Sequence, residues 1–548
     1  MRAYRAEEIA EIVGGSVLAG DGGAEILRFS TNSREGDINT MFVPVIGEHV
    51  DAHDYIPDAY RHGMRAVFTS RGEILPDTPD MTYIGVEDNV AALQRFSAYI
   101  RDSLGVPVVG ITGSVGKTTT KEMIAAALET ELVTLKTEGN MNSQIGVPRM
   151  LCRLEPEHQI AVIEMGMSEP GEMARLAAAA RPECAVITNI GVSHIGQLGS
   201  KGNIRKEKLN IINEFPDGGT LFLNGDDPML AELAEMQLGL GNSWHAISEP
   251  TRERFAGAKI VTFGLGEHCD YRAGGITVQE GRMTFRLHCP GDGGDYPGEI
   301  ELSVSGEHNV RNALAAIAVA EHYGVRPEQA ARGLARYEPI AMRGGKREAG
   351  GVVLIDDTYN ASPDSMRGGI DILAATPANR RIAVLADMLE LGELSRECHE
   401  EVGRCAAERG IDLLVAVGPQ ARYYAEAFAG QTGECAAAAE PAGEGAECAD
   451  APCCTADAKA VVAGEIAKMP QEAAKAEAEA PGPAEANGSR SRINQEEEQA
   501  RRQVHFDTNA EALAFLEREL NFGDAVLFKG SRGMRLEELV EGIARARS

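Results

Sequence analysis

The segment from Gly110 to Thr120 constrains the fold of this chain more than any other part of the sequence. It reads Gly-Ile-Thr-Gly-Ser-Val-Gly-Lys-Thr-Thr-Thr, begins within an apolar run and is followed by a helical pattern over 117–130. Closely spaced glycines let backbone amides approach a phosphate, and the start of a helix adds positive potential. Isoleucine stands at position 111, where the longer form of this motif has glycine. The segment therefore predicts a strand–loop–helix phosphate site of the shorter Gly-x-x-Gly-Lys-Thr type.

The residues of this loop predict contacts to a nucleotide. Lys117 would neutralise the β- and γ-phosphates, and the Thr118 hydroxyl would ligate Mg²⁺. The alternative is a glycine-rich turn with an exposed lysine, which the flanking strand and helix disfavour. The nucleotide-binding residues predicted in the loop are Gly113, Ser114, Val115, Gly116, Lys117, Thr118 and Thr119.

Apolar runs and helical patterns divide the chain into three α/β domains, over 1–106, 107–338 and 339–548. Strands that are apolar throughout indicate a parallel sheet covered on both faces. The central domain is therefore predicted to be a doubly wound sheet of the P-loop ATPase type. Residues 260–305 carry Gly-rich turns between short strands and favour antiparallel pairing there.

Residues 431–503 differ from the rest of the chain. They are rich in Ala, Glu, Gly and Pro, with almost no aromatic or β-branched residues. Such a segment cannot bury enough apolar surface to offset its ordering entropy. We expect a low-complexity, disordered insertion in the third domain, at most transiently helical near 471–480. It contains Cys435, Cys448, Cys453 and Cys454, whose spacing matches no common zinc site.

Composition excludes several classes of protein. The chain has 53 Lys and Arg against 83 Asp and Glu, a formal charge of −30, which argues against binding to nucleic acid or to an anionic membrane surface. No run approaches 18 apolar residues, so we expect no membrane insertion. The first residues lack the apolar stretch of a signal peptide. We therefore expect a cytoplasmic monomer with reduced thiols.

Motifs in a fixed order along the chain resemble those of the ATP-dependent Mur ligases. These motifs are Thr112–Thr120, Gly139–Asn142, Glu164–Gly166, Asn189–His194 and Gly306–Ala313. Three more segments are similar to the family members that add D-alanyl-D-alanine to UDP-MurNAc-tripeptide, namely Asp356–Met366, Asp387–Gly392 and Lys529–Arg532.

This resemblance implies a fold and a reaction. The fold has a UDP-sugar-peptide-binding domain, a central ATP-binding domain and a Rossmann-like C-terminal domain. The reaction is an amide ligation that passes through an acyl phosphate and gives UDP-MurNAc-pentapeptide, ADP and phosphate for peptidoglycan synthesis. ATP and two Mg²⁺ ions are the implied cofactors.

The resemblance also implies residue roles. The catalytic residues would be Lys117, Glu164, His194 and a carbamylated Lys208, and the metal ligands would be Thr118, Glu164, His194 and that same lysine. Nearby Lys201 and Lys206 compete with Lys208 for this role. Further nucleotide contacts would come from Asn309, Asn312, Arg343 and Asp357. Asn309 could also cap a helix over 309–321.

Substrate contacts are implied in all three domains. For the UDP-sugar they are Ser30, Thr31, Asn32, Ser33, Arg34, Gly47, Glu48 and His53, although the first five could instead form Asx and Ser turns. The other substrate-binding candidates are Asn140, Asn142, Tyr359, Asn360, Asp364, Lys529, Ser531 and Arg532. The last three suit a free carboxylate but could also form a solvated loop.

Two positions depart from the family pattern. Ser143 stands where a second Asn is usual, and Met342 replaces the glycine before Arg343, so the local turn is expected to differ. Another Mur-type amino acid ligase, a folylpolyglutamate synthetase and a non-catalytic nucleotide-binding scaffold are the alternatives. The string Asp357-Thr-Tyr-Asn favours the dipeptide-adding reaction, and the presence of Lys117, Glu164 and His194 disfavours the scaffold.

Overall fold

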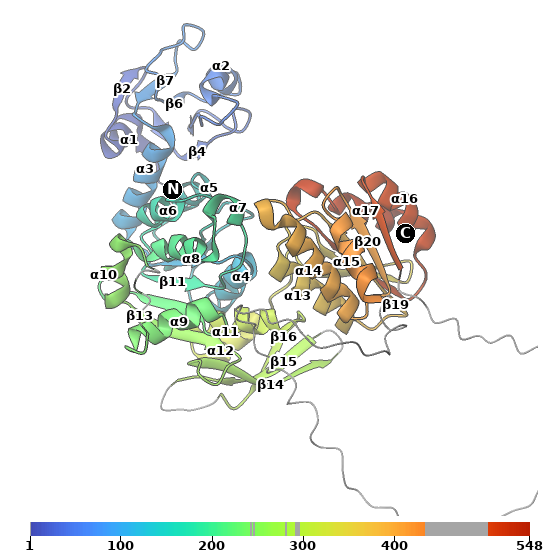
Figure 1. Cartoon of the computed structure of the whole chain (residues 1–548). Coiled ribbons are helices and arrows are strands. Elements are labelled where there is room, and N and C mark those ends of the chain that lie inside the picture. The colour runs from blue at the N-terminus through green and yellow to red at the C-terminus, as the bar shows by residue number, and fades with distance from the viewer. Residues whose placement is uncertain are drawn as a thin grey trace, which may run out of the picture. The chain divides into compact units, whose positions relative to one another are not determined.

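The strands and helices of this chain form an α/β structure (Figure 1). The computed structural model describes residues 2–241, 244, 247–279, 282–290, 296–432 and 502–547. Within those ranges the strands form sheets of two, five, nine and six strands. No helix in the same ranges has the length and apolar character needed to span a membrane.

The N-terminal part is built on the five-stranded sheet, in the order β2-β7-β6-β5-β4. Neighbouring strands are parallel except β2, which runs antiparallel to β7, while β1 and β3 form the small two-stranded sheet. Its elements are β1 (Tyr4–Arg5), α1 (Ala6–Val13), β2 (Ser16–Ala19), β3 (Glu25–Ile26), β4 (Arg28–Ser30), β5 (Thr40–Phe42), α2 (Ile56–Arg61), β6 (Ala66–Thr69), β7 (Thr82–Gly85) and α3 (Asn89–Leu104).

The central part is built on the nine-stranded sheet, in the order β16-β15-β14-β13-β12-β11-β8-β10-β9. Strands β8 to β14 pair in parallel, and β14, β15 and β16 pair antiparallel. The antiparallel pairing predicted for residues 260–305 is therefore confirmed for β14 to β16 but wrong for β13, which pairs in parallel with both of its neighbours. The strands are β8 (Val108–Thr112), β9 (Thr134–Lys136), β10 (Ile160–Glu164), β11 (Cys184–Ile187), β12 (Thr220–Asn224), β13 (Lys259–Gly264), β14 (Tyr271–Gln279), β15 (Arg282–His288) and β16 (Glu299–Leu302). The helices are α4 (Lys117–Leu128), α5 (Gly146–Leu151), α6 (Glu172–Ala180), α7 (Ile195–Leu198), α8 (Lys201–Leu209), α9 (Pro228–Gln237), α10 (Glu249–Gly257), α11 (Glu307–His322) and α12 (Pro327–Leu334).

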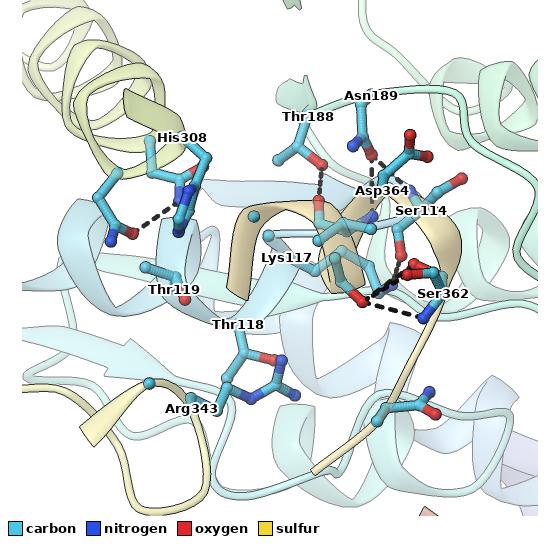
Figure 2. Close-up of a pocket in the computed structure, with 18 of the residues that line it drawn as sticks. Ser114, Lys117, Thr118, Thr119, Thr188, Asn189, His308, Arg343, Ser362 and Asp364 are labelled. Atoms are coloured by element: carbon cyan, nitrogen blue, oxygen red, sulfur yellow. Dashed lines mark hydrogen bonds between the residues drawn. The ribbon is translucent and has the colours of Figure 1, made fainter. Parts of the chain in front are cut away.

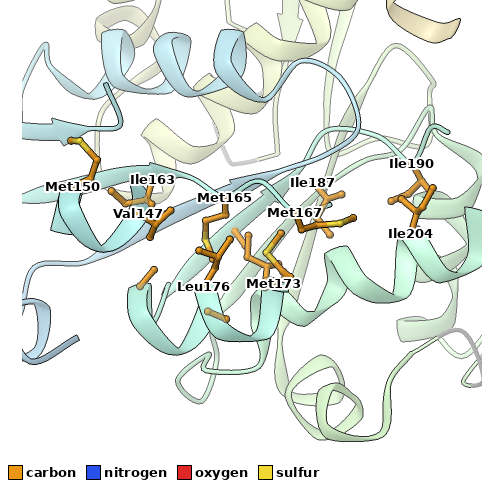
Figure 3. Packing of buried hydrophobic residues seen from close by; sticks show 14 of the residues in the cluster. Val147, Met150, Ile163, Met165, Met167, Met173, Leu176, Ile187, Ile190 and Ile204 are labelled. Carbon is orange, nitrogen blue, oxygen red and sulfur yellow. The ribbon is translucent and has the colours of Figure 1, made fainter. Parts of the chain in front are cut away.

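Alternation along the central strands explains why helices cover both faces of this sheet. In β10, Ile160 and Val162 belong to the core that contains α4 and α11, whereas Ala161 and Ile163 belong to the core that contains α5 and α6. Figure 3 shows Ile163 of β10 among side chains of α5 and α6. Because successive side chains of a strand point to opposite faces, an apolar strand needs two such cores.

The C-terminal part is built on the six-stranded sheet, in the order β17-β18-β22-β19-β20-β21, which is parallel except for β17. Its strands are β17 (Gly345–Ala349), β18 (Val352–Asp357), β19 (Arg380–Ala386), β20 (Leu413–Val417), β21 (Arg502–Phe506) and β22 (Asp524–Lys529). Its helices are α13 (Pro363–Ala375), α14 (Ser395–Glu408), α15 (Arg422–Thr432), α16 (Asn509–Glu519) and α17 (Glu537–Arg547).

Two details of the sequence predictions are wrong. The predicted insertion 431–503 includes the end of α15 and the first two residues of β21. The polar sequence of β21 does not predict a strand, but its backbone pairs with β20. The remainder, 433–501 with the possible helix near 471–480, lies outside the described residues. Asn309 does not cap a helix, because α11 begins at Glu307 with Gly306 as its N-cap.

Candidate active site

Polar side chains gather where the parallel strands of the central sheet end. The phosphate loop follows β8, Glu164 closes β10, Thr188 and Asn189 follow β11, and Asn224 closes β12. Strand β8 lies between β10 and β11, at the point where the strand order reverses. Ligands of open α/β sheets bind at the carboxyl ends of the strands at such a point.

The phosphate loop needs glycine at two positions. Gly113 has φ 149° and Gly116 has φ 86°, both in the region that favours glycine, and a Cβ on Gly113 would lie 1.9 Å from Thr188 Oγ1. The Lys117 amine donates hydrogen bonds to the carbonyls of Gly113 at 2.8 Å and Ser114 at 3.4 Å. Lys117 is thereby folded over the loop that it is predicted to serve.

The loop after β11 holds the phosphate loop in place. The side-chain oxygen of Asn189 accepts hydrogen bonds from the amides of Ser114 at 3.0 Å and Val115 at 2.8 Å. Thr188 Oγ1 donates to the Val115 carbonyl at 2.5 Å. Figure 2 shows both side chains beside the loop. Sequence reasoning quoted Asn189 within a motif but gave it no role.

Glu164 is buried, and one of its carboxylate oxygens accepts no hydrogen bond from the described residues. Its Oε1 accepts a hydrogen bond from Asn142 Nδ2 at 2.8 Å, whereas the buried Oε2 receives none from the described residues. An acceptor of this kind fits a hard cation. No cluster of three or more His, Cys, Asp or Glu side chains in the described part of the chain could hold a metal. Glu164 and Thr118 both line the cavity described below and carry oxygen atoms of the kind that Mg²⁺ prefers.

The half-buried Lys117 lies near this carboxylate, and the buried Lys208 lies near Lys117. Burial lowers the pKa of Lys117, an effect that Glu164 opposes and Arg343 reinforces. Burial and the neighbouring charge of Lys117 hold the pKa of Lys208 well below its ordinary value. Of the lysines on α8, Lys208 is buried, whereas Lys201 and Lys206 are exposed, which favours Lys208 in the earlier competition.

A cavity of about 850 Å³ brings many of the predicted residues together. The loop residues Ser114 to Thr119 line it, and so do Asn142, Glu164, His194, Asn309, Asn312, Arg343, Asp357, Tyr359, Asn360, Asp364 and Lys529. The predicted residues that do not line it are Gly113, Asn140, Lys208, Ser531, Arg532 and the N-terminal candidates Ser30–Arg34, Gly47, Glu48 and His53.

The C-terminal side chains of the cavity are paired with one another. The Lys529 amine donates to Asp357 Oδ2 at 2.6 Å and to the Asn360 carbonyl at 3.1 Å. The Arg343 guanidinium lies 3.9 Å from the centre of the Tyr359 ring. Met342, just before Arg343, has φ 67°, in the left-handed region that usually favours glycine.

The N-terminal candidates are largely occupied within their own loops. Asn32 forms the turn that was the alternative for this segment, because its Oδ1 accepts from the Arg34 amide at 3.1 Å. His53 is 2% exposed and holds Asp51 Oδ1 at 2.6 Å through Nδ1, while its Nε2 accepts from the Ser70 amide at 3.2 Å. His53 therefore fastens this loop.

The cavity also has polar lining residues that sequence reasoning did not select. They include Thr188, Asn189, Asn224, Asp226, His308, Arg311 and Lys346. His308 and Arg311 lie in the quoted motif Gly306–Ala313, so a helical-face analysis of that motif could have found them. Lys346 comes from the exposed edge strand β17 and carries no sequence signal.

Two family models match this chain. The Mur ligase middle domain matches residues 111–320, and the Mur ligase, glutamate ligase domain, matches residues 342–463. The chain belongs to the Mur ligase family. The resemblance, the α/β fold class and the ligase class predicted from the motifs are thereby confirmed.

Mur ligases of known sequence and structure agree with this assignment. The UDP-N-acetylmuramoyl-tripeptide–D-alanyl-D-alanine ligase of Bacillus subtilis is 34% identical over 77% of this chain and 86% of its own length. The crystal structure of MurF from Acinetobacter baumannii is similar with a TM-score of 0.76 and 27% identity, over 100% of this chain and 99% of that one. MurF ligase from Thermotoga maritima in complex with ADP gives a TM-score of 0.69 and 25% identity, over 95% and 97% of the two chains.

Proposed function

We propose that this Mur ligase joins D-alanyl-D-alanine to UDP-MurNAc-tripeptide at the expense of ATP. One observation supports the proposal most directly. The cavity combines a phosphate loop and a buried carboxylate oxygen available to a cation with basic and polar side chains of the C-terminal part. That combination suits the transfer of a phosphoryl group onto an anionic acceptor, which is mainly an electrostatic problem.

The reaction needs two displacements. The terminal carboxylate of the tripeptide attacks the γ-phosphorus of ATP, the bond to the β-phosphate oxygen breaks, and ADP leaves. The amine of D-alanyl-D-alanine then attacks the acyl carbon, the amide bond forms, and phosphate departs as the amine loses its proton. Lys117 leaves the loop carbonyls of Gly113 and Ser114 and offsets the phosphate charge, while Asn189 holds the loop in shape.

Mg²⁺, held by Thr118 and Glu164, would neutralise phosphate charge when bound. Asn142 orients Glu164 for this role through its 2.8 Å hydrogen bond. His194 lines the same cavity and is the further candidate ligand for a second ion. Asn309 and Asn312 would contact the adenine. The Asn312 oxygen accepts a hydrogen bond from Thr120 Oγ1 at 3.0 Å, which fixes its amide beside α4.

We also propose that Lys208 carries a carbamate. Burial lowers the pKa of this amine and so favours its neutral form, which can attack CO₂, form an N–C bond and lose a proton. The product is an anion next to the charge of Lys117, so the modified side chain would stabilise the pair. Bicarbonate labelled with ¹³C should give a carbamate signal that Lys208→Gln removes and Lys206→Gln preserves; a signal retained in Lys208→Gln would exclude this site.

The remaining candidates are assigned by the chemistry of the substrates. Ser30–Arg34, Gly47 and Glu48 would contact the UDP-sugar, and Lys529 with Arg343 would offset substrate carboxylates and phosphates. The cytoplasm is the proposed compartment, because the reaction consumes ATP and a nucleotide sugar.

Phosphate release by the purified protein tests the proposed reaction. Release should require ATP, Mg²⁺, UDP-MurNAc-tripeptide and D-alanyl-D-alanine together, and UDP-MurNAc-pentapeptide should accumulate in equal amount. Replacement of the dipeptide by diaminopimelate or glutamate serves as the control for the other Mur-type reactions. Release without the dipeptide, or ligation of either control amino acid instead, would contradict the proposal.

A further inference from the structure

The segment Asp387–Gly392 was singled out in the sequence, yet the proposed reaction gives it no role. It follows β19, and hydrogen bonds hold its backbone firmly. The Met388 amide donates to His399 Nε2 at 3.1 Å, and the Leu389 amide donates to Ser531 Oγ at 2.9 Å. Asp387 Oδ1 accepts from the Ala421 amide at 2.7 Å. These hydrogen bonds therefore fix the backbone position of the residue that follows Leu389.

The side chain that follows is Glu390, and it contacts His194. Glu390 Oε2 lies 2.6 Å from His194 Nδ1. That nitrogen is buried and forms no aligned hydrogen bond with any described residue, so the close contact with Glu390 is an ion-pair contact. The backbones meet as well, because the Gly196 amide donates to the Glu390 carbonyl at 3.3 Å. A Cβ on Gly196 would lie 3.2 Å from that carbonyl oxygen, so the glycine permits the approach.

Both partners have an uncommon backbone conformation. His194 has φ 61° and Glu390 has φ 66°, in the left-handed region that residues with a Cβ rarely adopt. Such residues persist where the surrounding structure imposes them, and they cluster at functional sites. Here two of them face each other across the contact between a loop of the central sheet and a loop of the C-terminal sheet.

We propose that Glu390 is the positioning residue for His194. Its carboxylate accepts the Nδ1 proton, which fixes the ring and leaves Nε2 as the atom available to the cavity. Because Glu390 comes from the C-terminal part, the histidine is oriented only while that part is seated on α7. The catalytic role of this pair rests on the proposed function, whereas the contact between the two side chains does not depend on it.

Kinetics of three variants test the catalytic consequence. Glu390→Ala should lower kcat by about 10- to 100-fold, the usual effect of removing a partner that orients an active-site histidine, with little change in the KM for ATP. Glu390→Gln, which keeps the acceptor oxygen, should recover part of that loss. Glu393→Ala, at an exposed glutamate just after this segment, is the matched control and should leave kcat unchanged.

A double-mutant cycle shows whether Glu390 acts through His194. In the His194→Ala background, Glu390→Ala should cause no further loss, because the group that it positions is absent. Independent losses that multiply in the double variant would overturn the proposal. If Glu390→Ala fails to fold, the isosteric Glu390→Gln carries the same cycle.

The ring nitrogens of His194 supply a readout that needs no substrate. In protein labelled with [¹⁵N]histidine, the signals that disappear in His194→Gln belong to this ring. Wild type should show a protonated Nδ1 and an unprotonated Nε2, and Glu390→Ala should shift both signals toward tautomer averaging. Signals that stay unchanged in Glu390→Ala would overturn the inference. If the signals shift as expected but the protein has no ligase activity, the result would count against the proposed function alone.

Discussion

The carboxyl edge of the central sheet and the loops of the N-terminal sheet were both predicted to bind substrate, and they use their polar groups differently. At the central edge, Glu164 keeps a buried oxygen without a hydrogen bond from the described residues. In the N-terminal loops, His53 is engaged at both ring nitrogens by Asp51, Ser70 and Asn89. Both are polar and suited to ligand contact by residue type.

The two regions differ in how many hydrogen-bond donors and acceptors remain without a partner in the protein. A parallel sheet ends in loops that converge at one edge, so side chains there face a shared space rather than one another. A short loop that bridges two strands instead satisfies its donors and acceptors locally, which is the role of Asx and Ser turns. Residue type alone does not distinguish a group that binds ligand from a group that fastens a loop.

Substitution of Lys117 is expected to have the largest effect. Lys117→Ala should lower ATP turnover by about 10²- to 10³-fold, because one preorganised group that stabilises transition-state charge is worth about that much. Phosphate release measures the loss, and Lys206→Ala on the exposed face of α8 is the control. Near-normal turnover of Lys117→Ala would mean that the loop does not cradle the reacting phosphates.

His53 should behave as a fastening residue. His53→Ala would leave the Ser70 amide and the Asn89 side chain without their acceptor, at a cost of about 1–3 kcal/mol to the local stability of the N-terminal part. Hydrogen–deuterium exchange in β6 and β7 measures this loss. The exposed His49→Ala should not change exchange. A raised KM for the UDP-sugar with normal exchange would instead make His53 a binding residue.

The same loop should respond to acid through Asp51. Burial alone would raise the pKa of this carboxyl, but hydrogen bonds from the His53 amide and ring and from Arg71 outweigh it and lower the pKa to about 2. Because the folded pKa is depressed, the carboxylate stabilises the loop at pH values above about 4, and this contribution is lost as the pH falls toward about 2.

Asp51→Asn should therefore exchange faster than wild type near neutral pH, and the difference should shrink as the pH falls through that window. Asp54→Asn, whose side chain is 69% exposed beside the same Arg71, is the control and should show a smaller difference. A difference that stays constant with pH would exclude the carboxylate as its source.

The smallest effect is expected at Met342. A left-handed φ destabilises the folded state by about 1–2 kcal/mol for a residue with a Cβ, and glycine would remove this strain. Glycine also has more conformational freedom in the unfolded chain, which reduces the gain by about 0.4–1 kcal/mol. Met342→Gly should therefore stabilise the chain by about 0.5–1 kcal/mol in urea unfolding. Ala341→Gly, which lacks a positive φ, should destabilise it slightly. Destabilisation by Met342→Gly would show that the thioether contact with Arg532 outweighs the strain.

Local patterns in the sequence were enough to predict the α/β class, the phosphate loop and the family, because an apolar strand followed by glycines and a helix start has few other solutions. The choice of Lys208 among three lysines of one helix came from the resemblance alone, because local patterns do not show which face of α8 is buried. Strand β21 escaped prediction because parallel pairing with β20 stabilises it more than its own residues do.

By itself the sequence determined which groups are present at each strand end and in what order they follow along the chain. Only the tertiary structure decided which of these groups face one cavity and which are hydrogen-bonded to neighbouring residues. It also decided that Glu390 contacts His194, which lies 196 residues earlier in the chain. The physical reason is that hydrogen-bonding capacity is set by residue type, whereas its use depends on which groups folding places within about 3 Å of one another.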